Sequence, residues 1–190
     1  DAEESTNGGS VSLTSSDLEL GADGSTNQIV GMRFSNASVP QGAAITNAYL
    51  EFEVDEVSTA ATSVTIRGQA ADTAPAFAGT TGNISSRPQT LSQIPWNNIS
   101  PWDTVNVKHQ TPDLSPIIQE IVNRPGWVSG NAVVLTIQGT GRRTAEAYDG
   151  EIPAAAKLII TYATGPIPTP TLTPTPSPTP TKAAAYSSDL

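Results

Sequence analysis

Residues 47–54 read NAYLEFEV, and apolar and polar side chains alternate along this stretch. One face of an extended chain would carry its even-numbered residues, which are Ala48, Leu50, Phe52 and Val54. The opposite face would include the odd-numbered residues Tyr49, Glu51 and Glu53. A period of two is the pattern of a half-buried β-strand. The stretch therefore predicts a strand that turns Leu50 and Phe52 toward a core and its glutamates toward solvent.

Other stretches of the chain have the same character. Residues 63–70, SVTIRGQA, alternate again, and further apolar runs are IVGMRF at 29–34, AVVLTIQG at 132–139 and KLIITYA at 157–163. Glycine, proline, asparagine and serine between these runs are typical of turns. Residues 1–163 are therefore predicted to fold as one all-β domain, an antiparallel β-sandwich of jelly-roll-like form. The predicted core comprises Met32, Phe34, Leu50, Phe52, Ile66, Leu135, Ile137 and Ile160.

One segment departs from the β pattern. In residues 111–127, TPDLSPIIQEIVNRPGW, the apolar residues follow helical spacing at Leu114, Ile117, Ile118, Ile121 and Val122. This spacing predicts a short amphipathic helix from Leu114 to Val122 whose apolar side faces the core. Thr111 or Asp113 is the expected N-cap.

Composition narrows the function classes. The chain has 190 residues, with nine Lys and Arg against eighteen Asp and Glu, and no cysteine. Scattered basic residues and a net negative charge argue against a nucleic-acid partner. Disulfides, thiolate metal sites and a cysteine nucleophile are excluded. No apolar run reaches the ~20 residues that a membrane-spanning helix requires, so no membrane span is expected.

Residues 164–182 are rich in proline and threonine, which favours an extended linker. Such linkers connect extracellular modules and are suited to O-glycosylation, so we expect a secreted or cell-surface protein. The candidate O-glycosylation residues are Thr169, Thr171, Thr173, Thr175, Ser177 and Thr179. Sequons for N-glycosylation occur at Asn36, Asn83 and Asn98, which ordinary polar loops would equally explain.

The order of these features resembles a known family. DAEES, SSDLELG, RFS followed by VPQGAAITNAYLEF, IPWN, the helix with RPGW, NAVVLTIQG and KLIITY succeed one another along the domain. This succession resembles the DNRLRE-type β-sandwich modules and related carbohydrate-binding-like domains of secreted bacterial and archaeal proteins. The resemblance implies a jelly-roll sandwich in a multidomain surface or secreted protein. It implies fold and location more firmly than any activity.

The resemblance also draws attention to the last residues of the chain. Family members usually begin with a strand that runs into the acids of a DAEE-like stretch, whereas here Asp1 comes first. Residues 183–190, AAAYSSDL, are strand-compatible, and KAAAYSSDL written before DAEES resembles the uninterrupted opening of one module. We therefore expect this segment to dock on a copy of the protein, head to tail, as separate subunits or as a tandem array. Docking on its own domain is the alternative. The expected docking residues are Ala183, Ala184, Ala185, Tyr186 and Leu190.

Catalysis is not expected. His109 is the single histidine, so neither a catalytic triad nor a histidine-rich metal site can be assembled around it. Alternating glutamates on an outward strand face, such as Glu51 and Glu53, are normally solvated rather than arranged as a glycosidase pair. We therefore predict that the protein is not an enzyme.

Two ligands are considered. Acidic loops offer the oxygen ligands that calcium selects, and the predicted set is Glu3, Glu146 and Asp149, against simple solubilising charge. Exposed aromatic rings stack on sugars, and the candidates for a glycan platform are Trp96, Trp102 and Trp127, against ordinary core tryptophans. Two function classes follow. The first is an extracellular structural module that assembles into a fibre or surface array, and the second is a carbohydrate-binding module tethered by the proline-threonine linker.

Overall fold

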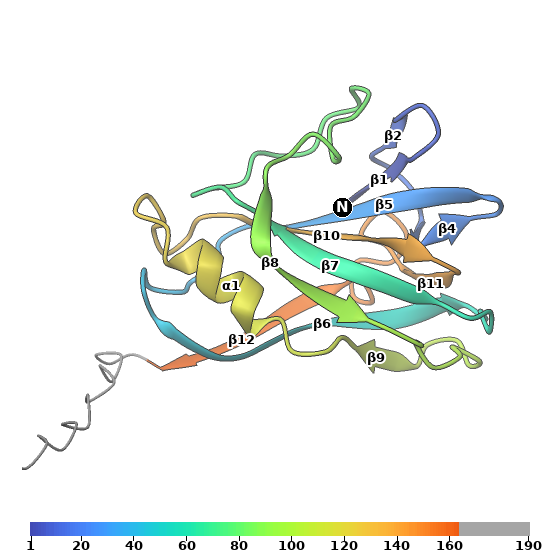
Figure 1. The fold of residues 1–190 in the computed structure, drawn as a ribbon. Coiled ribbons are helices and arrows are strands. Elements are labelled where there is room, and N and C mark those ends of the chain that lie inside the picture. Colours follow the sequence, from blue (N-terminus) through green and yellow to red (C-terminus); the bar gives the residue numbers. More distant parts are fainter. Residues whose placement is uncertain (164–190) are drawn as a thin grey trace, which may run out of the picture.

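The computed structural model describes residues 1–163, which form two antiparallel β-sheets packed face to face (Figure 1). The predicted all-β sandwich is thereby confirmed. The expected linker at 164–182 and docking segment at 183–190 lie outside the described residues.

The first sheet has seven strands in the order β2-β1-β5-β10-β7-β8, with β4 paired to β5. Their bounds are β1 Ala2–Ser5, β2 Val11–Ser12, β4 Ala22–Asp23, β5 Thr26–Phe34, β7 Ser63–Gln69, β8 Gln89–Trp96 and β10 Val133–Thr140. The central strand β10 pairs with β5 on one side and with β7 on the other.

The second sheet has five strands in the order β12-β6-β11-β3, with β9 also paired to β6. Their bounds are β3 Asp17–Leu20, β6 Ala44–Glu56, β9 Lys108–Gln110, β11 Arg143–Glu146 and β12 Lys157–Ala163. The long strand β6 pairs with β12, β11 and β9, so it is the organising strand of this sheet.

The NAYLEFEV stretch forms the middle of β6 with the predicted orientation. Leu50 and Phe52 have no exposed surface, whereas Glu51 and Glu53 are partly exposed. Most of the predicted core is likewise buried: Met32, Leu50, Phe52, Ile66, Leu135 and Ile137. The two exceptions are Phe34 and Ile160, which are only half-buried.

The predicted helix is α1, Ser115–Val122, and it is the single helix within residues 1–163. Its apolar residues Ile117, Ile118, Ile121 and Val122 are buried against the sandwich. The N-cap prediction was wrong, because Leu114 occupies that position and no side chain caps the helix. Asp113 accepts hydrogen bonds from the backbone N–H groups of Ala48 and Ser115 instead, and so ties the helix start to β6.

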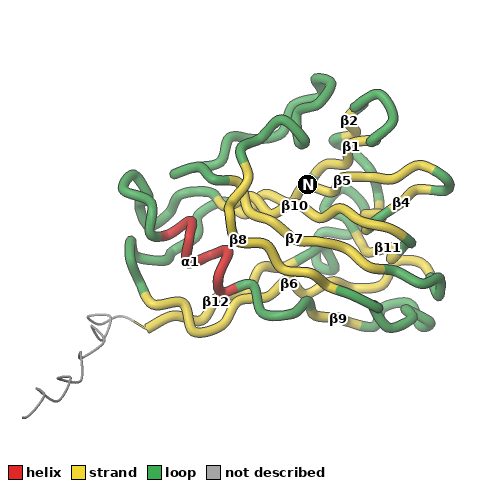
Figure 2. The backbone as a smooth tube through the Cα atoms, in the orientation of Figure 1, coloured by secondary structure: helices red, strands yellow, loops and turns green. Residues whose placement is uncertain are grey.

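Two buried arginines hold long loops in place. Arg87 donates to the carbonyls of Pro75, Ala76 and Asn83 and lies over the ring of Phe77, which fixes the loop between β7 and β8 drawn in green in Figure 2. Arg143 has 1% of its surface exposed. Its guanidinium donates to backbone carbonyls of two loops, those of Ala60, Ile99 and Ser100.

Candidate functional site

An apolar groove separates the end of β5 from β12. Its volume is about 550 Å³, and it lies between the two sheets at one edge of the sandwich. The lining residues come from Asp1, the end of β5 with the loop after it, the loop after β11, and β12. They include Met32, Phe34, Ala37, Val39, Leu158, Ile160 and Tyr162.

Both strands that border the groove have a free edge there. β1 begins at Ala2, opposite Gly31, whereas β5 continues to Phe34. On the β1 side, therefore, no described strand pairs with Arg33 or Phe34. β12 pairs with β6 on one side, and no strand within residues 1–163 pairs with its other side. Unpaired N–H and C=O groups along such edges can receive a further strand.

The groove contains the two exceptions to the predicted core. Phe34 and Ile160 line it and pack against the buried cluster, but they are only half-buried. Ile160 lies opposite the buried Ala48 of β6, and thus faces the inside of the sandwich. Residues 1–163 therefore bury only part of the side chains of Phe34 and Ile160, which the sequence predicted as core.

Each end of the groove is marked by a hydrogen bond. The Tyr162 hydroxyl donates to the Ser38 carbonyl over 3.0 Å at the end where β12 finishes. At the other end the Asp1 carboxylate accepts from the Tyr148 N–H over 3.0 Å. The groove thus runs from the exit of β12 to the start of β1.

The edge strand β8, at the far side of the seven-stranded sheet, is protected against the addition of a further strand. There the Glu120 carboxylate of α1 accepts hydrogen bonds of 2.8 Å from the N–H groups of both Leu91 and Ser92 in β8. Pro95, in the same strand, has no N–H to offer. A side-chain cap and a proline are common ways to block strand addition. The β5–β12 groove has no such protection among the residues described.

The predicted calcium ligands do not come together. Glu3 accepts a hydrogen bond from the Glu19 N–H, Glu146 lies beside Asp55, and Asp149 is exposed near the amino group of Asp1. The prediction of a Glu3, Glu146 and Asp149 set is therefore corrected. The reason is the strand order: Glu3 belongs to β1 of one sheet, whereas Glu146 ends β11 of the other sheet and Asp149 lies in the loop after it.

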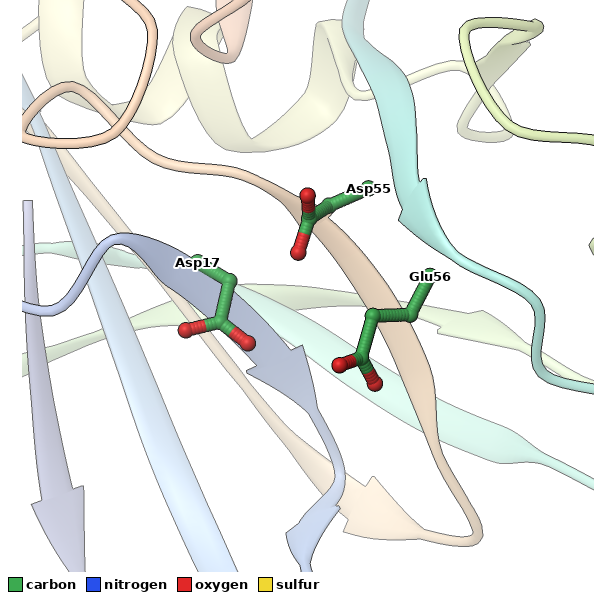
Figure 3. Close-up of side chains that lie close together, drawn as sticks. All are labelled: Asp17, Asp55 and Glu56. Carbon is green, nitrogen blue, oxygen red and sulfur yellow. The ribbon is translucent and has the colours of Figure 1, made fainter.

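A different acidic group does converge, as Figure 3 shows. Oxygen atoms of Asp17, Asp55 and Glu56 all lie within 4.8 Å of one another. Asp17 comes from β3 and the other two from β6, the strands on either side of β11. Glu56 also forms an ion pair of 3.4 Å with Arg142. Burial and the neighbouring Asp55 carboxylate raise the pKa of Glu146 to about 6, so this face of the sheet concentrates negative charge. Carboxylate oxygens are chemically suited to calcium.

A second acidic pair, Glu3 of β1 and Glu19 of β3, lines a polar pocket formed by residues of both sheets. Burial, together with the Glu3 carboxylate, raises the pKa of Glu19 to about 9. In the folded state Glu19 keeps a proton that the unfolded chain releases above the ordinary pKa of 4.5. The contribution of Glu19 to stability is therefore fully present below about pH 4.5 and is lost as the pH rises toward 9.

We expect the Glu19→Gln variant to reverse this loss. Its melting temperature should exceed that of the wild type near pH 8 and match it near pH 5. Glu19 is half-buried, so solvent screening limits the effect to about 1 kcal/mol, or roughly 3 °C. Thermal melts across this pH range provide the measurement, and an equal gain at pH 5 would mean that the variant acts through packing.

The same melts with added calcium chloride and with chelator address the calcium prediction. A bound ion would raise the melting temperature with calcium concentration. Asp55→Asn should remove a shift that comes from calcium bound by Asp17, Asp55 and Glu56. Glu19→Gln should instead remove a shift that comes from calcium bound by Glu3 and Glu19. Identical melts with calcium and with chelator would leave both clusters as plain negative charge.

The tryptophans do not form the predicted glycan platform. Trp102 and Trp127 have 0% and 2% of their surface exposed, and Trp96 is half-buried. Trp102 packs against Phe52, Trp96 and His109, and its ring stacks on the histidine ring at 5.0 Å. The Trp127 indole N–H donates to the Val39 carbonyl over 2.9 Å. These rings are core and loop anchors, so the platform prediction was wrong for Trp102 and Trp127.

The three sequons differ in accessibility. Asn36 and Asn98 are exposed and have positive φ values of 59° and 51°. The Asn83 carboxamide oxygen accepts from the Ala78 N–H and from Arg87, so it is engaged within its own loop. The predicted O-glycosylation residues and docking residues lie outside the described part of the chain.

No protein-family model matches the sequence, and no curated protein is similar to it. The resemblance to DNRLRE-type modules therefore stays a prediction. The single helix formed by residues 1–163 lacks the length and apolar character needed to cross a membrane.

Proposed function

We propose that the protein is a non-catalytic structural module of an extracellular fibre or surface array. Its C-terminal segment completes the sandwich of the next copy, so that the copies associate head to tail. One feature supports this function above the others: the groove at the edge of the sandwich, where apolar side chains and two free strand edges occur together.

The groove has the chemistry of an unfinished core. Half-buried aromatic and aliphatic side chains line it, and burial of apolar surface contributes about 25 cal/mol per Å². A strand placed there would bury these side chains and pair with backbone groups at the same time. Small-molecule sites are also mostly apolar with a few polar groups, but they do not require unpaired strand edges. Strand addition therefore accounts for the groove better than a soluble ligand does.

The sequence outside the sandwich is consistent with the same function. A proline- and threonine-rich linker follows the last strand, and a strand-compatible octapeptide follows the linker. Linkers of this composition favour extended chain and keep successive modules apart. An extracellular location rests on this composition and on the family resemblance.

We expect the purified full-length chain to form linear polymers whose length grows with protein concentration. Contact between two different surfaces does not close on itself unless rotation brings the ends together, so an open filament is the expected product. Negative-stain electron microscopy and sedimentation velocity over a concentration series test this. Monodisperse monomers at every concentration would contradict head-to-tail assembly.

A further inference from the structure

We infer that residues Ala183–Leu190 of a neighbouring copy occupy the groove between β5 and β12, as a strand antiparallel to both. This inference rests on the proposed head-to-tail assembly, and it adds the acceptor site and the direction of the incoming strand.

The direction follows from the register of β1. This strand is antiparallel to β5, with Ala2 opposite Gly31 and Glu3 opposite Val30. A strand that continues this direction ahead of Asp1 would lie along Arg33 and Phe34 of β5. The incoming segment therefore ends beside Asp1 and enters the groove from the other end.

The entry lies where β12 finishes. Tyr162 contacts Ser38 at that end, while Asp1 contacts Tyr148 at the opposite end. β12 thus runs from the Asp1 end toward the entry, and an incoming strand that travels toward Asp1 runs antiparallel to it. Both free edges can consequently pair with one strand.

The side chains of the segment suit this position. The alanines at 183–185 are small enough to lie between two sheet edges, and Tyr186 supplies one large ring. The segment carries a single charged side chain, Asp189, whereas the groove offers Phe34, Leu158 and Ile160. A mainly uncharged segment can be buried there without leaving several charges unpaired.

The length of chain beyond the sandwich favours a neighbouring copy as the source. Residues 165–181 reach roughly 50 Å in polyproline II conformation, at about 3.1 Å per residue. Since the groove opens at the end where β12 finishes, a segment from the same copy has to reverse its direction within the proline-rich sequence. Proline-rich sequence favours a straight course over several residues, which disfavours such a turn.

Two variants that each keep one half of the proposed contact, and are called half-competent here, test the inference. Ile160→Lys places a charge in the groove and leaves the tail intact, whereas deletion of residues 183–190 removes the tail and leaves the groove intact. Ile159→Lys is the matched control, because Ile159 pairs with Tyr49 and its side chain points to the opposite face of β12. Ser35→Arg blocks the groove from an exposed lining position that does not disturb the core.

Neither half-competent variant should form polymers alone, and the wild type and Ile159→Lys should. Mixing the two half-competent variants should give heterodimers, because the tail of one fits the groove of the other, and native mass spectrometry detects them. Ile160→Lys and Ser35→Arg should each weaken uptake of an added Ala183–Leu190 peptide by the deletion variant about tenfold or more. Melting curves establish that each variant is folded.

The outcomes separate the two proposals. If the wild type polymerises but groove variants polymerise equally well, head-to-tail assembly stands and the groove is not its acceptor. The wild type could instead stay monomeric while the deletion lowers its stability at every concentration. The segment would then occupy the groove of its own chain, and the inference that a neighbouring copy supplies it would be wrong. If the wild type is monomeric and the peptide does not bind the deletion variant, both proposals are wrong.

Discussion

Replacing Arg143 by methionine is expected to lower the free energy of unfolding by about 3–5 kcal/mol. Methionine has a comparable length but cannot donate the hydrogen bonds that reach the carbonyls of Ala60 and Ser100, over 2.8 and 3.0 Å. Each buried acceptor left without a donor costs about 1–3 kcal/mol. Because Arg143 also donates to the Thr62 hydroxyl, the variant should loosen both loops that its side chain joins.

Urea titration measures this loss through the transition midpoint. Arg142→Met is the matched control, since the side chain of this neighbouring arginine is partly exposed and forms an ion pair of 3.4 Å with Glu56. The control should change stability by no more than about 0.5 kcal/mol. Equal losses in the two variants would show that the buried hydrogen bonds of Arg143 contribute little beyond its charge.

Phe52→Ala is expected to cost about 3–5 kcal/mol, the usual range for removing a buried aromatic ring. Phe52 has no exposed surface and lies 6.4 Å from Trp96 and 6.2 Å from Trp102, measured between ring centroids. Its loss would leave a cavity between the two sheets. Tryptophan fluorescence in a denaturant titration provides both the midpoint and a local report of the repacking.

The adjacent residue supplies the control for strand register. Glu53→Gln keeps the size of the side chain and removes a charge from the acidic outer face, where Glu146 is close. It should leave stability unchanged or slightly higher. A large loss at Glu53 with a small one at Phe52 would mean that β6 has the opposite orientation.

The alternation in NAYLEFEV was sufficient to predict the orientation of β6, and the further apolar runs with turn residues between them predicted the sandwich. A strand with one buried face specifies its register strongly, because a shift by one residue exposes every apolar side chain. Helical spacing located α1 to within one residue of its start. The pairing of Asp113 with β6 was beyond prediction, since it depends on how the helix lies against a strand distant in sequence.

Site residues were harder to predict, for a physical reason. The predicted calcium ligands were chosen from acidic stretches of the sequence, but Asp17, Asp55 and Glu56 meet because β3 and β6 flank β11, which no local pattern encodes. Trp102 and Trp127 looked available because they occur in loop-like sequence, yet both pack inward. Phe34 and Ile160 were the most informative departures, since their apolar pattern indicated a core that residues 1–163 leave partly open.

The position of β10 has a consequence for the making of the protein. This strand lies between β5 and β7, and β11 likewise lies between β6 and β3, although both are encoded late in the chain. The first sheet cannot complete its central pairings until residue 140 has been synthesised, and the second cannot until residue 146 has been. Pairings between segments far apart in sequence also form slowly. We therefore expect the nascent chain to leave the ribosome largely unfolded.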